Sequence, residues 1–243
     1  MNRAPFHFRD FLRAKDNLRR ALVDDDETYV LLTGDTGTGK TALLRELRSD
    51  LDRARQRVLY FSEAKKLGAA GLVKVVGESL RVRTSTCHSV SLDRVLRTLA
   101  DETQRVMLWI DEAHELPEET LSEARALAES DLDGGRRVQV VLVGLPRLRA
   151  ALQSRPHLWR RVAVREEITG LVLDELQDFL DHHFPGQSKR LCDRGSSTLF
   201  ERGKGVPGLL LPMHRAILSR AGTAKGKIDP ADVEETLARW DLP

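Results

Sequence analysis

One octapeptide near the start of this 243-residue chain constrains its fold more than any other feature. Residues 34–41 read Gly-Asp-Thr-Gly-Thr-Gly-Lys-Thr, which fits the phosphate-loop pattern of a glycine, four free positions and Gly-Lys-Thr. The apolar run 29–32 before it predicts a buried parallel strand. Leucines at helical spacing over residues 41–51 predict a helix after it. A strand, a glycine loop and a helix in this order favour a nucleotide site over a chance match.

The residue types of this loop suit a polyphosphate. Glycines allow a tight turn that aims backbone N–H groups inward, and the N-terminus of the following helix adds partial positive charge. Lys40 is expected to reach the β- and γ-phosphates of ATP, and the Thr41 hydroxyl to bind Mg²⁺. The predicted nucleotide-binding residues are Gly34, Asp35, Thr36, Gly37, Thr38, Gly39, Lys40 and Thr41.

A second candidate site follows an apolar strand predicted over residues 106–110, which ends in Asp111-Glu112-Ala113-His114. Asp111 is expected to hold Mg²⁺, directly or through water. Glu112 is expected to act as the general base that polarises the attacking water. An acid at a strand end is also common as a helix cap or a surface residue. Its position downstream of a phosphate loop favours the nucleotide role.

The alternation of strands and helices indicates an α/β fold. Further strands are predicted over residues 57–61, 138–143 and 162–168, with helices between them. This order predicts a five-stranded parallel sheet flanked by helices, with its ligand at the carboxyl ends of the strands. Only helices are predicted after Gly170. The sequence therefore predicts a nucleotide-binding domain over residues 1–170 and a small helical domain over residues 171–243.

Composition adds few constraints. The net charge of +2 favours no particular partner, and two cysteines are too few for a disulfide scaffold. No apolar run approaches the length needed to span a membrane, and the first ten residues lack the apolar core of a signal peptide. We therefore expect a cytoplasmic protein without a membrane partner.

The motifs together resemble those of AAA+ ATPases, and within them the transposition regulators TniB, TnsC and MuB and the related ExeA-type ATPases. The segments that carry the resemblance are residues 34–41, 111–114, 141–148, 160–161 and 205–221. It covers almost the whole chain and implies a helical lid after the sheet domain. Many AAA+ proteins have a polar residue where this chain has Gly144, and a lid arginine where it has Gly208. The ExeA-type pattern shares the first glycine. Because Gly208 replaces the lid arginine, another residue, such as Lys204 or Arg215, would have to sense the γ-phosphate.

The resemblance implies an ATP-dependent, DNA-binding regulator of transposition. ATP would drive homo-oligomerisation into a ring or helical filament on DNA, the oligomer would recruit or activate a transposase, and hydrolysis would disassemble it. Arg160 or Arg161 would serve as an arginine finger on a neighbour's γ-phosphate. Two adjacent arginines before a strand are equally consistent with surface charge.

DNA contacts in related filaments line an inner channel. The matching basic residues here follow the second strand and are Lys65, Lys66, Lys74, Arg81 and Arg83. Solvated surface charge is an equally good interpretation of them. The sequence has no helix-turn-helix or zinc pattern, so binding without sequence specificity is expected.

Two other functions are compatible with the same motifs. One is an ExeA-like ATPase of secretion or envelope assembly, whose expected discriminator is an added membrane span and periplasmic domain. The other is a nucleotide-dependent switch that binds a protein partner and no DNA. Asp-Glu-Ala-His also occurs in helicases, but these need two RecA-like cores. His114 is expected either to make a satisfied polar contact or to couple the ATP site to a neighbour.

Overall fold

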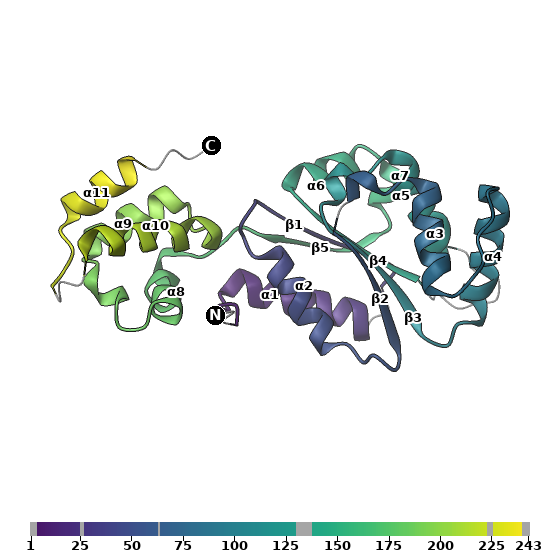
Figure 1. Ribbon diagram of the computed structural model, residues 1–243, viewed down its shortest axis with the longest axis horizontal. Coiled ribbons are helices and arrows are strands. Elements are labelled where there is room, and N and C mark those ends of the chain that lie inside the picture. The colour runs from purple at the N-terminus through teal and green to yellow at the C-terminus, as the bar shows by residue number, and fades with distance from the viewer. Residues whose placement is uncertain (1–3, 25–26, 63, 130–137, 223–225, 240–243) are drawn as a thin grey trace. The chain divides into compact units, whose positions relative to one another are not determined.

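The computed structural model describes residues 4–24, 27–62, 64–129, 138–222 and 226–239 (Figure 1). The chain divides into two compact units. Residues 14–34 and 43–167 form the sheet unit, and residues 1–13, 35–42 and 168–243 form the helical unit. The longest piece of the helical unit thus begins at Ile168, close to the predicted boundary at Gly170. The helical unit also takes in most of the phosphate loop.

A five-stranded parallel sheet forms the centre of the sheet unit. Its strand order is β2-β3-β4-β1-β5, and the strands are β1 Tyr29–Gly34, β2 Gln56–Phe61, β3 Arg105–Ile110, β4 Val138–Gly144 and β5 Val162–Ile168. Every residue of β1 and β4 is buried, which explains why both read as continuous apolar runs. Tyr29 pairs with Val140, and Leu108 pairs with Val140 from the other side. The predicted sheet is confirmed.

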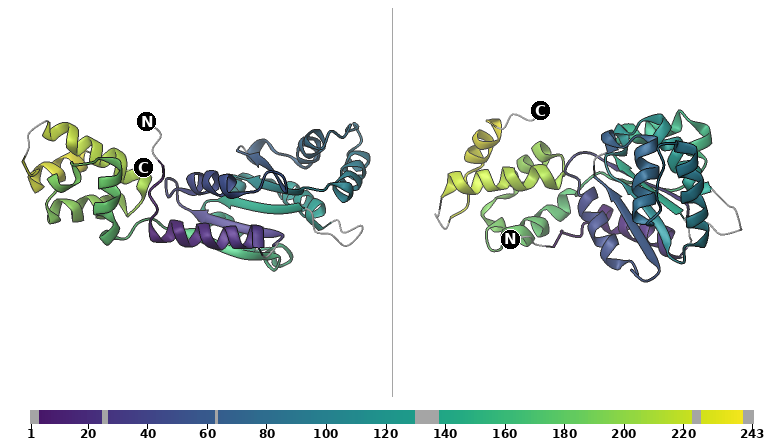
Figure 2. Two further views of the ribbon diagram at one scale, coloured as in Figure 1. Left: turned by 90° about the horizontal axis from the view of Figure 1, so that it is seen from below. Right: turned by 45° about the vertical axis from the view of Figure 1, so that its right-hand side comes forward.

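Helices cover both faces of this sheet (Figure 1, Figure 2). One face is covered by α3 Ala69–Ser79, α4 His88–Asp101, α5 Glu118–Glu129, α6 Pro146–Gln153 and α7 Pro156–Trp159. The other face is covered by α1 Arg9–Arg19 and α2 Lys40–Asp50. On the face covered by α3 to α7, strand residues such as Leu31 and Leu108 pack in one core with Leu72 of α3 and Val95 of α4. Such burial of apolar area is the main force that holds a layered sheet together.

One helix begins earlier than its apolar pattern predicts. The spacing predicts a helix over residues 92–99, whereas α4 begins at His88. Ser91 accounts for the extension, because it is buried and its hydroxyl accepts a hydrogen bond from the Ser85 N–H at 2.8 Å. A polar residue satisfied in this way can lie inside the protein, although it reads as a loop in the sequence.

The described part of the helical unit contains the α-helices α8 Leu176–His183, α9 Asp193–Gly203, α10 Pro207–Ala221 and α11 Pro230–Ala238. Buried apolar residues, among them Leu180, Leu199 and Met213, form its interior. The N-terminal segment belongs to this unit, where Phe6 contacts Phe179 edge to face at 5.6 Å. Among the described residues, none of the helices combines the length and the apolar character needed to cross a bilayer.

Candidate nucleotide site

The phosphate loop curls around one carbonyl oxygen of its own backbone. Asp35 O accepts hydrogen bonds from Thr38 Oγ1 at 2.9 Å and from Lys40 Nζ at 2.9 Å. Gly37 and Gly39 have φ angles of 85° and 105°, which residues with a side chain rarely adopt. The Lys40 side chain is buried at the start of α2, whereas Thr41 is exposed. An anionic phosphate oxygen would be a stronger acceptor for the Lys40 ammonium than this neutral carbonyl.

The N-terminus of α10 lies directly on this loop within the helical unit. Gly208 N donates a hydrogen bond to Gly37 O at 3.0 Å. A Cβ atom on Gly208 would lie only 2.8 Å from Gly37 Cα. This contact gives a physical reason for glycine where the resemblance to AAA+ ATPases predicts arginine, since two backbones approach too closely for a side chain. The alternative residue Lys204 lies at the C-terminal end of α9, exposed and with a positive φ of 51°.

The acid pair follows β3 in the sheet unit. Asp111 is 5% exposed, and its Oδ1 accepts a hydrogen bond from Glu112 N at 2.9 Å. Glu112 has φ 53° and ψ 34°, a left-handed conformation that costs free energy for a residue with a side chain. Its side chain is about half exposed, at 53%. Asp111 is therefore a fixed, buried carboxylate, while Glu112 is presented to solvent by a strained backbone.

Tyr60 is a member of this group that the sequence analysis did not single out. Its hydroxyl donates a hydrogen bond to Asp111 Oδ2 at 2.8 Å. Burial, together with this hydrogen bond to a carboxylate, raises the pKa of Tyr60 to about 12. The tyrosine therefore stays protonated as a donor at neutral pH. Its only sequence signal is its place near the end of the strand beside β3, where it pairs with Trp109.

His114 also joins this group. Its side chain is 5% exposed, and Nδ1 lies 3.4 Å from Glu112 Oε2. The same ring nitrogen accepts a hydrogen bond from Leu145 N at 3.3 Å, just beyond β4. The expected polar contact of His114 is present.

Sheet topology places Gly34, the first residue of the phosphate loop, and the acid pair at one edge. The strands β1 and β3 run parallel on either side of β4, so Gly34 at the end of β1 and Asp111 after β3 lie at the same edge of the sheet. The loop continues directly from Gly34.

No group of three or more His, Cys, Asp or Glu side chains suited to a metal ion occurs among the described residues. The predicted set for Mg²⁺, Thr41 and Asp111, has one carboxylate, which fits an ion that nucleotide phosphates and water also bind.

The two finger candidates differ in their surroundings. Both Arg160 and Arg161 follow α7, and Arg161 is exposed. Arg161 Nε lies 2.9 Å from Glu129 Oε1, so its charge is already engaged within the sheet unit. Within the described part of the chain, Arg160 has no such ion pair. Of the two, Arg160 has the charge available for another molecule.

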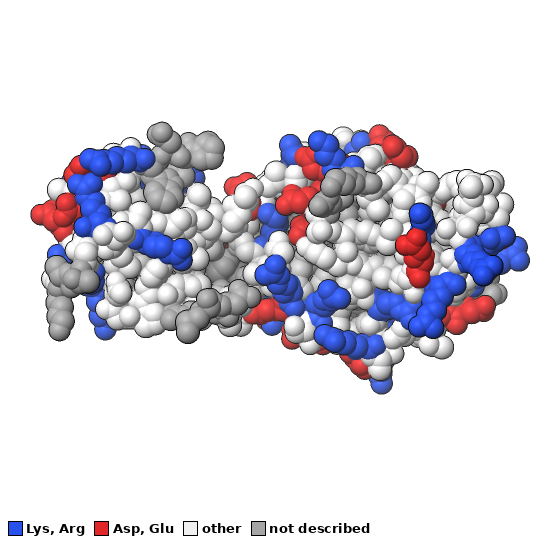
Figure 3. All heavy atoms as spheres, in the orientation of Figure 1, with Lys and Arg blue, Asp and Glu red and all other residues white. Residues whose placement is uncertain are grey.

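The predicted DNA-binding residues lie on several elements of the sheet unit. Lys65 and Lys66 lie in a short 3-10 helix over residues 64–66, Lys74 lies in α3, and Arg81 and Arg83 follow that helix. Lys74 pairs with Glu78 at 4.0 Å, so part of its charge is balanced. In Figure 3, acidic atoms lie among the basic ones on the visible face of each unit. The structure therefore places these residues in one unit, with an acidic neighbour at Lys74.

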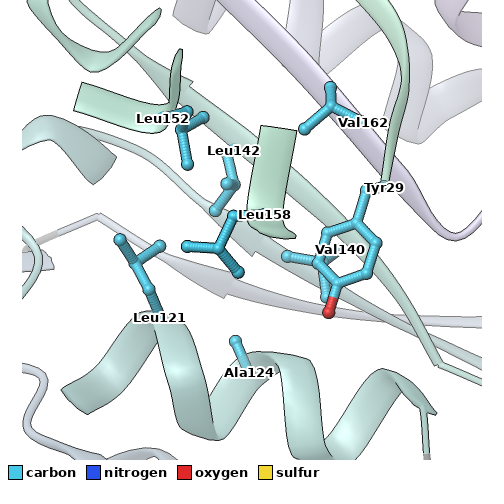
Figure 4. A pocket seen from close by; sticks show the side chains of 8 residues that line it. All are labelled: Tyr29, Leu121, Ala124, Val140, Leu142, Leu152, Leu158 and Val162. Atoms are coloured by element: carbon cyan, nitrogen blue, oxygen red, sulfur yellow. The ribbon is translucent and has the colours of Figure 1, made fainter. Parts of the chain in front are cut away.

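A small apolar pocket lies away from both motifs, among α5, α6, α7 and the sheet (Figure 4). Tyr29 lines it with Leu121, Val140 and Leu158. Its volume is about 10 Å³, room for about one water molecule. Burial raises the pKa of Tyr29 far above its usual range, and its hydroxyl has no hydrogen-bond partner in the described structure. This pocket is too small for a nucleotide and is a packing defect of the core.

Comparison with known proteins agrees with this geometry. The profile of a family described as AAA domain matches residues 23–152. General secretion pathway protein A of Aeromonas hydrophila is 30% identical over 232 residues, which cover 90% of this chain and 42% of that protein. The chain thus spans about two fifths of that relative's length.

Solved structures with the same fold share little sequence with this chain. The CDC6P structure from Pyrobaculum aerophilum has a TM-score of 0.71 at 20% identity, covering 97% of this chain and 68% of that one. The Aeropyrum pernix ORC1 protein in complex with DNA has a TM-score of 0.62 at 18% identity, covering 94% and 64%. The Thermotoga maritima RuvB Holliday junction branch migration motor has 0.60 at 18%, covering 93% and 67%. At these identities the likeness establishes the fold.

Proposed function

Since the chain belongs to the AAA domain family, we propose that it binds ATP with Mg²⁺ and hydrolyses the ATP to ADP and phosphate. The observation that carries this proposal is the strand order, which brings Gly34, where the phosphate loop begins, to the same edge of a parallel sheet as the buried Asp111 and the solvent-facing Glu112. Phosphoryl transfer needs mainly positioning and charge stabilisation, and these residue types supply both.

Each residue has a separate role in this proposal. Backbone N–H groups of the loop and the Lys40 ammonium would hold the phosphates, and Lys40 would give up its bond to Asp35 O. Thr41 and Asp111 would hold Mg²⁺, which supplies charge neutralisation on the phosphate oxygens when bound. Glu112 would accept the proton of the attacking water.

Arg160 is the finger that we propose for a neighbouring subunit. It has no ion pair within the described part of the chain, while the charge of Arg161 is paired with Glu129. A finger supplied by another copy makes hydrolysis depend on homo-oligomerisation into a ring or a helical filament. Hydrolysis by wild type should then rise more steeply than linearly with protein concentration, and replacing Arg160 should remove that rise.

For the biological role, we propose an ATP-dependent regulator that assembles on DNA in the cytoplasm and recruits a transposase. Two observations support the DNA part: the basic residues after β2, among which Lys65, Arg81 and Arg83 are exposed, and the fold shared with proteins solved in complex with DNA. The transposase rests on the motif resemblance alone.

A secretion ATPase is the second candidate. The 30% identity to general secretion pathway protein A over 90% of this chain favours it. In this role the chain acts on a protein partner through the same nucleotide site, and DNA binding is not required. If the chain is instead a nucleotide-dependent switch that binds a protein partner, DNA binding is likewise not required.

A salt titration of DNA binding separates these functions. ATP-bound wild type is compared with the Lys65→Ala/Lys66→Ala double variant on two unrelated duplexes. If these lysines contact phosphates, the variant should bind both duplexes more weakly, and the slope of log K against log salt should fall by roughly 0.9 per lost contact. The matched control is Lys227→Ala/Arg239→Ala, which removes the same charge from exposed positions of the helical unit.

The outcomes assign the role. Equal losses in both double variants would indicate net charge rather than a site. An unchanged slope would move the site, although the next candidates Lys189, Arg190 and Arg194 are weaker, because Arg190 bonds to Gly222 O and Arg194 pairs with Glu234. Absence of ATP-dependent DNA binding by wild type at low salt would exclude the transposition role and leave the protein-directed functions.

A further inference from the structure

The carboxyl end of β4 lacks a side chain of its own, and the ring of His114 occupies its place. Gly144 is the last residue of β4. A Cβ atom on Gly144 would lie 2.9 Å from His114 Nδ1 and 3.1 Å from Leu148 Cδ2. The glycine is therefore matched to the imidazole: any side chain on Gly144 would displace it.

The ring is fixed between the end of β4 and the acid pair. His114 comes from the 3-10 helix over residues 113–115, directly after Glu112 and Ala113. Its Nδ1 accepts a hydrogen bond from Leu145 N at 3.3 Å, which ties it to the chain beyond β4. Its Nε2 lies 3.4 Å from Glu115 Oε1, and Glu115 in turn pairs with Arg147. A side chain held at both nitrogens and 5% exposed has little freedom to move.

The same Nδ1 lies 3.4 Å from Glu112 Oε2, so the buried ring lies against the half-exposed carboxylate. Glu112 itself has a left-handed backbone and a half-exposed side chain. Because Nδ1 accepts from Leu145 N, it faces Glu112 with a lone pair and offers it no hydrogen bond, so the ring edge restricts where the carboxylate oxygen can lie.

From these contacts we infer that His114 is a positioning residue for Glu112, and that it takes the part of a polar side chain on β4 that this chain lacks. The inference rests on the proposed role of Glu112 as general base. Through the Leu145 bond, any shift at the end of β4 reaches the base by way of the ring. Loss of the ring should lower kcat while leaving ATP binding at the phosphate loop intact.

Steady-state ATPase measurements on a set of variants at His114 and Gly144 test this. His114→Ala should lower kcat roughly 10- to 100-fold, the range expected when a catalytic group is misplaced by about 1 Å, with KM for ATP within about twofold. His114→Gln keeps an acceptor for Leu145 N and should recover most of the loss. Gly144→Ser alone should also be slow, since its side chain collides with the ring.

The decisive comparison is between two double variants. His114→Ala/Gly144→Ser returns a polar group to the emptied space and should exceed both of its parent variants in kcat. His114→Ala/Gly144→Ala fills the same space without a polar group and should stay as slow as His114→Ala. If His114 served only for packing, both double variants would recover equally. Thermal unfolding of every variant checks that the comparison is made between folded proteins.

Two results would overturn the inference while leaving the proposed function in place: wild-type kcat in His114→Ala, or equal kcat in the two double variants. Absence of ATP turnover in the wild type is a different result. It would overturn the proposed function and this inference with it.

Discussion

The loop after β1 is held by backbone atoms, whereas the acid pair after β3 is held by side chains from other elements. In the first region, Asp35 O collects the bonds of Thr38 and Lys40, and Gly37 O accepts from Gly208 N. In the second, Asp111 depends on the hydroxyl of Tyr60, and Glu112 lies against His114. A backbone-built site is encoded by glycines at fixed spacing. A side-chain-built site is encoded by residues scattered over the chain.

The largest expected effect breaks the first region. Lys40→Ala should abolish ATP binding, because it removes the ammonium that faces the β- and γ-phosphates and leaves Asp35 O without that donor. Isothermal titration with Mg²⁺–ATP measures this directly. Lys227→Ala, which removes an exposed lysine of the helical unit, should bind as wild type does. Normal ATP affinity in Lys40→Ala would show that the loop is not the nucleotide site.

Glu112→Gln breaks the second region and spares the first. The variant keeps the shape and the backbone bond to Asp111 Oδ1 but loses the base. Turnover should fall about 10²- to 10⁴-fold, the usual contribution of general base catalysis, with ATP still bound. Glu119→Gln, at an exposed position of α5, is the matched control and should be fully active. Wild-type turnover in Glu112→Gln would remove this residue from catalysis.

Acid should weaken α10, the helix that contacts the phosphate loop. His214 in α10 is fully buried, and both of its ring nitrogens lack hydrogen-bond partners in the described structure. Burial, with a smaller effect of Arg190, lowers the pKa of His214 to about 4. Because the unfolded chain binds this proton more readily, stability should fall as the pH drops from about 6.5 through 4, by about 3 kcal/mol in total.

Urea unfolding at pH 7 and pH 5 tests this, with His214→Leu as the comparison. Between these pH values the wild type should lose about 2 kcal/mol more than the variant does. Equal losses in both proteins would show that His214 does not govern the acid response. The result bears on the phosphate loop because α10 contains both His214 and Gly208, and Gly208 N donates a hydrogen bond to Gly37 O of the loop.

Gly208→Ala should disturb the loop from outside its motif. The new Cβ atom would lie 2.8 Å from Gly37 Cα and 3.1 Å from Gly37 O, both backbone atoms that cannot move aside easily. We expect a loss of about 1–3 kcal/mol in unfolding free energy and weaker ATP binding. Gly71→Ala, where a Cβ meets no atom within 4 Å, should cost nothing. An unchanged ATP affinity in Gly208→Ala would separate the helix contact from nucleotide binding.

The smallest effect compares two tyrosines. Tyr60→Phe removes the donor to Asp111 Oδ2 and should cost about 1 kcal/mol of stability. Tyr29→Phe removes a buried hydroxyl that has no partner in the described structure, so it should be neutral or slightly stabilising. Chemical unfolding of both variants measures the difference. A loss in Tyr29→Phe as large as that in Tyr60→Phe would show that the bond to Asp111 adds nothing.

The same contrast explains what the sequence could predict. Apolar runs and the glycine loop sufficed to predict all five strands. Tyr60 and His114 could not be assigned from spacing, because their contacts depend on strand order. Tyr60 reaches Asp111 only because β2 lies beside β3 in register, and His114 reaches Leu145 because β4 lies on the other side. Gly208 reads as the start of a helix, and its contact with the loop backbone is visible only in the structure.

The left-handed backbone of Glu112 also bears on how this protein would respond to selection. A non-glycine residue in this conformation is held at a cost of about 1–2 kcal/mol, which glycine would relieve. Random libraries screened only for thermal tolerance should therefore enrich Glu112→Gly and, to a lesser degree, Glu112→Asn, at the expense of turnover. Persistence of glutamate at this position under such a screen would mean that its contacts offset the backbone strain.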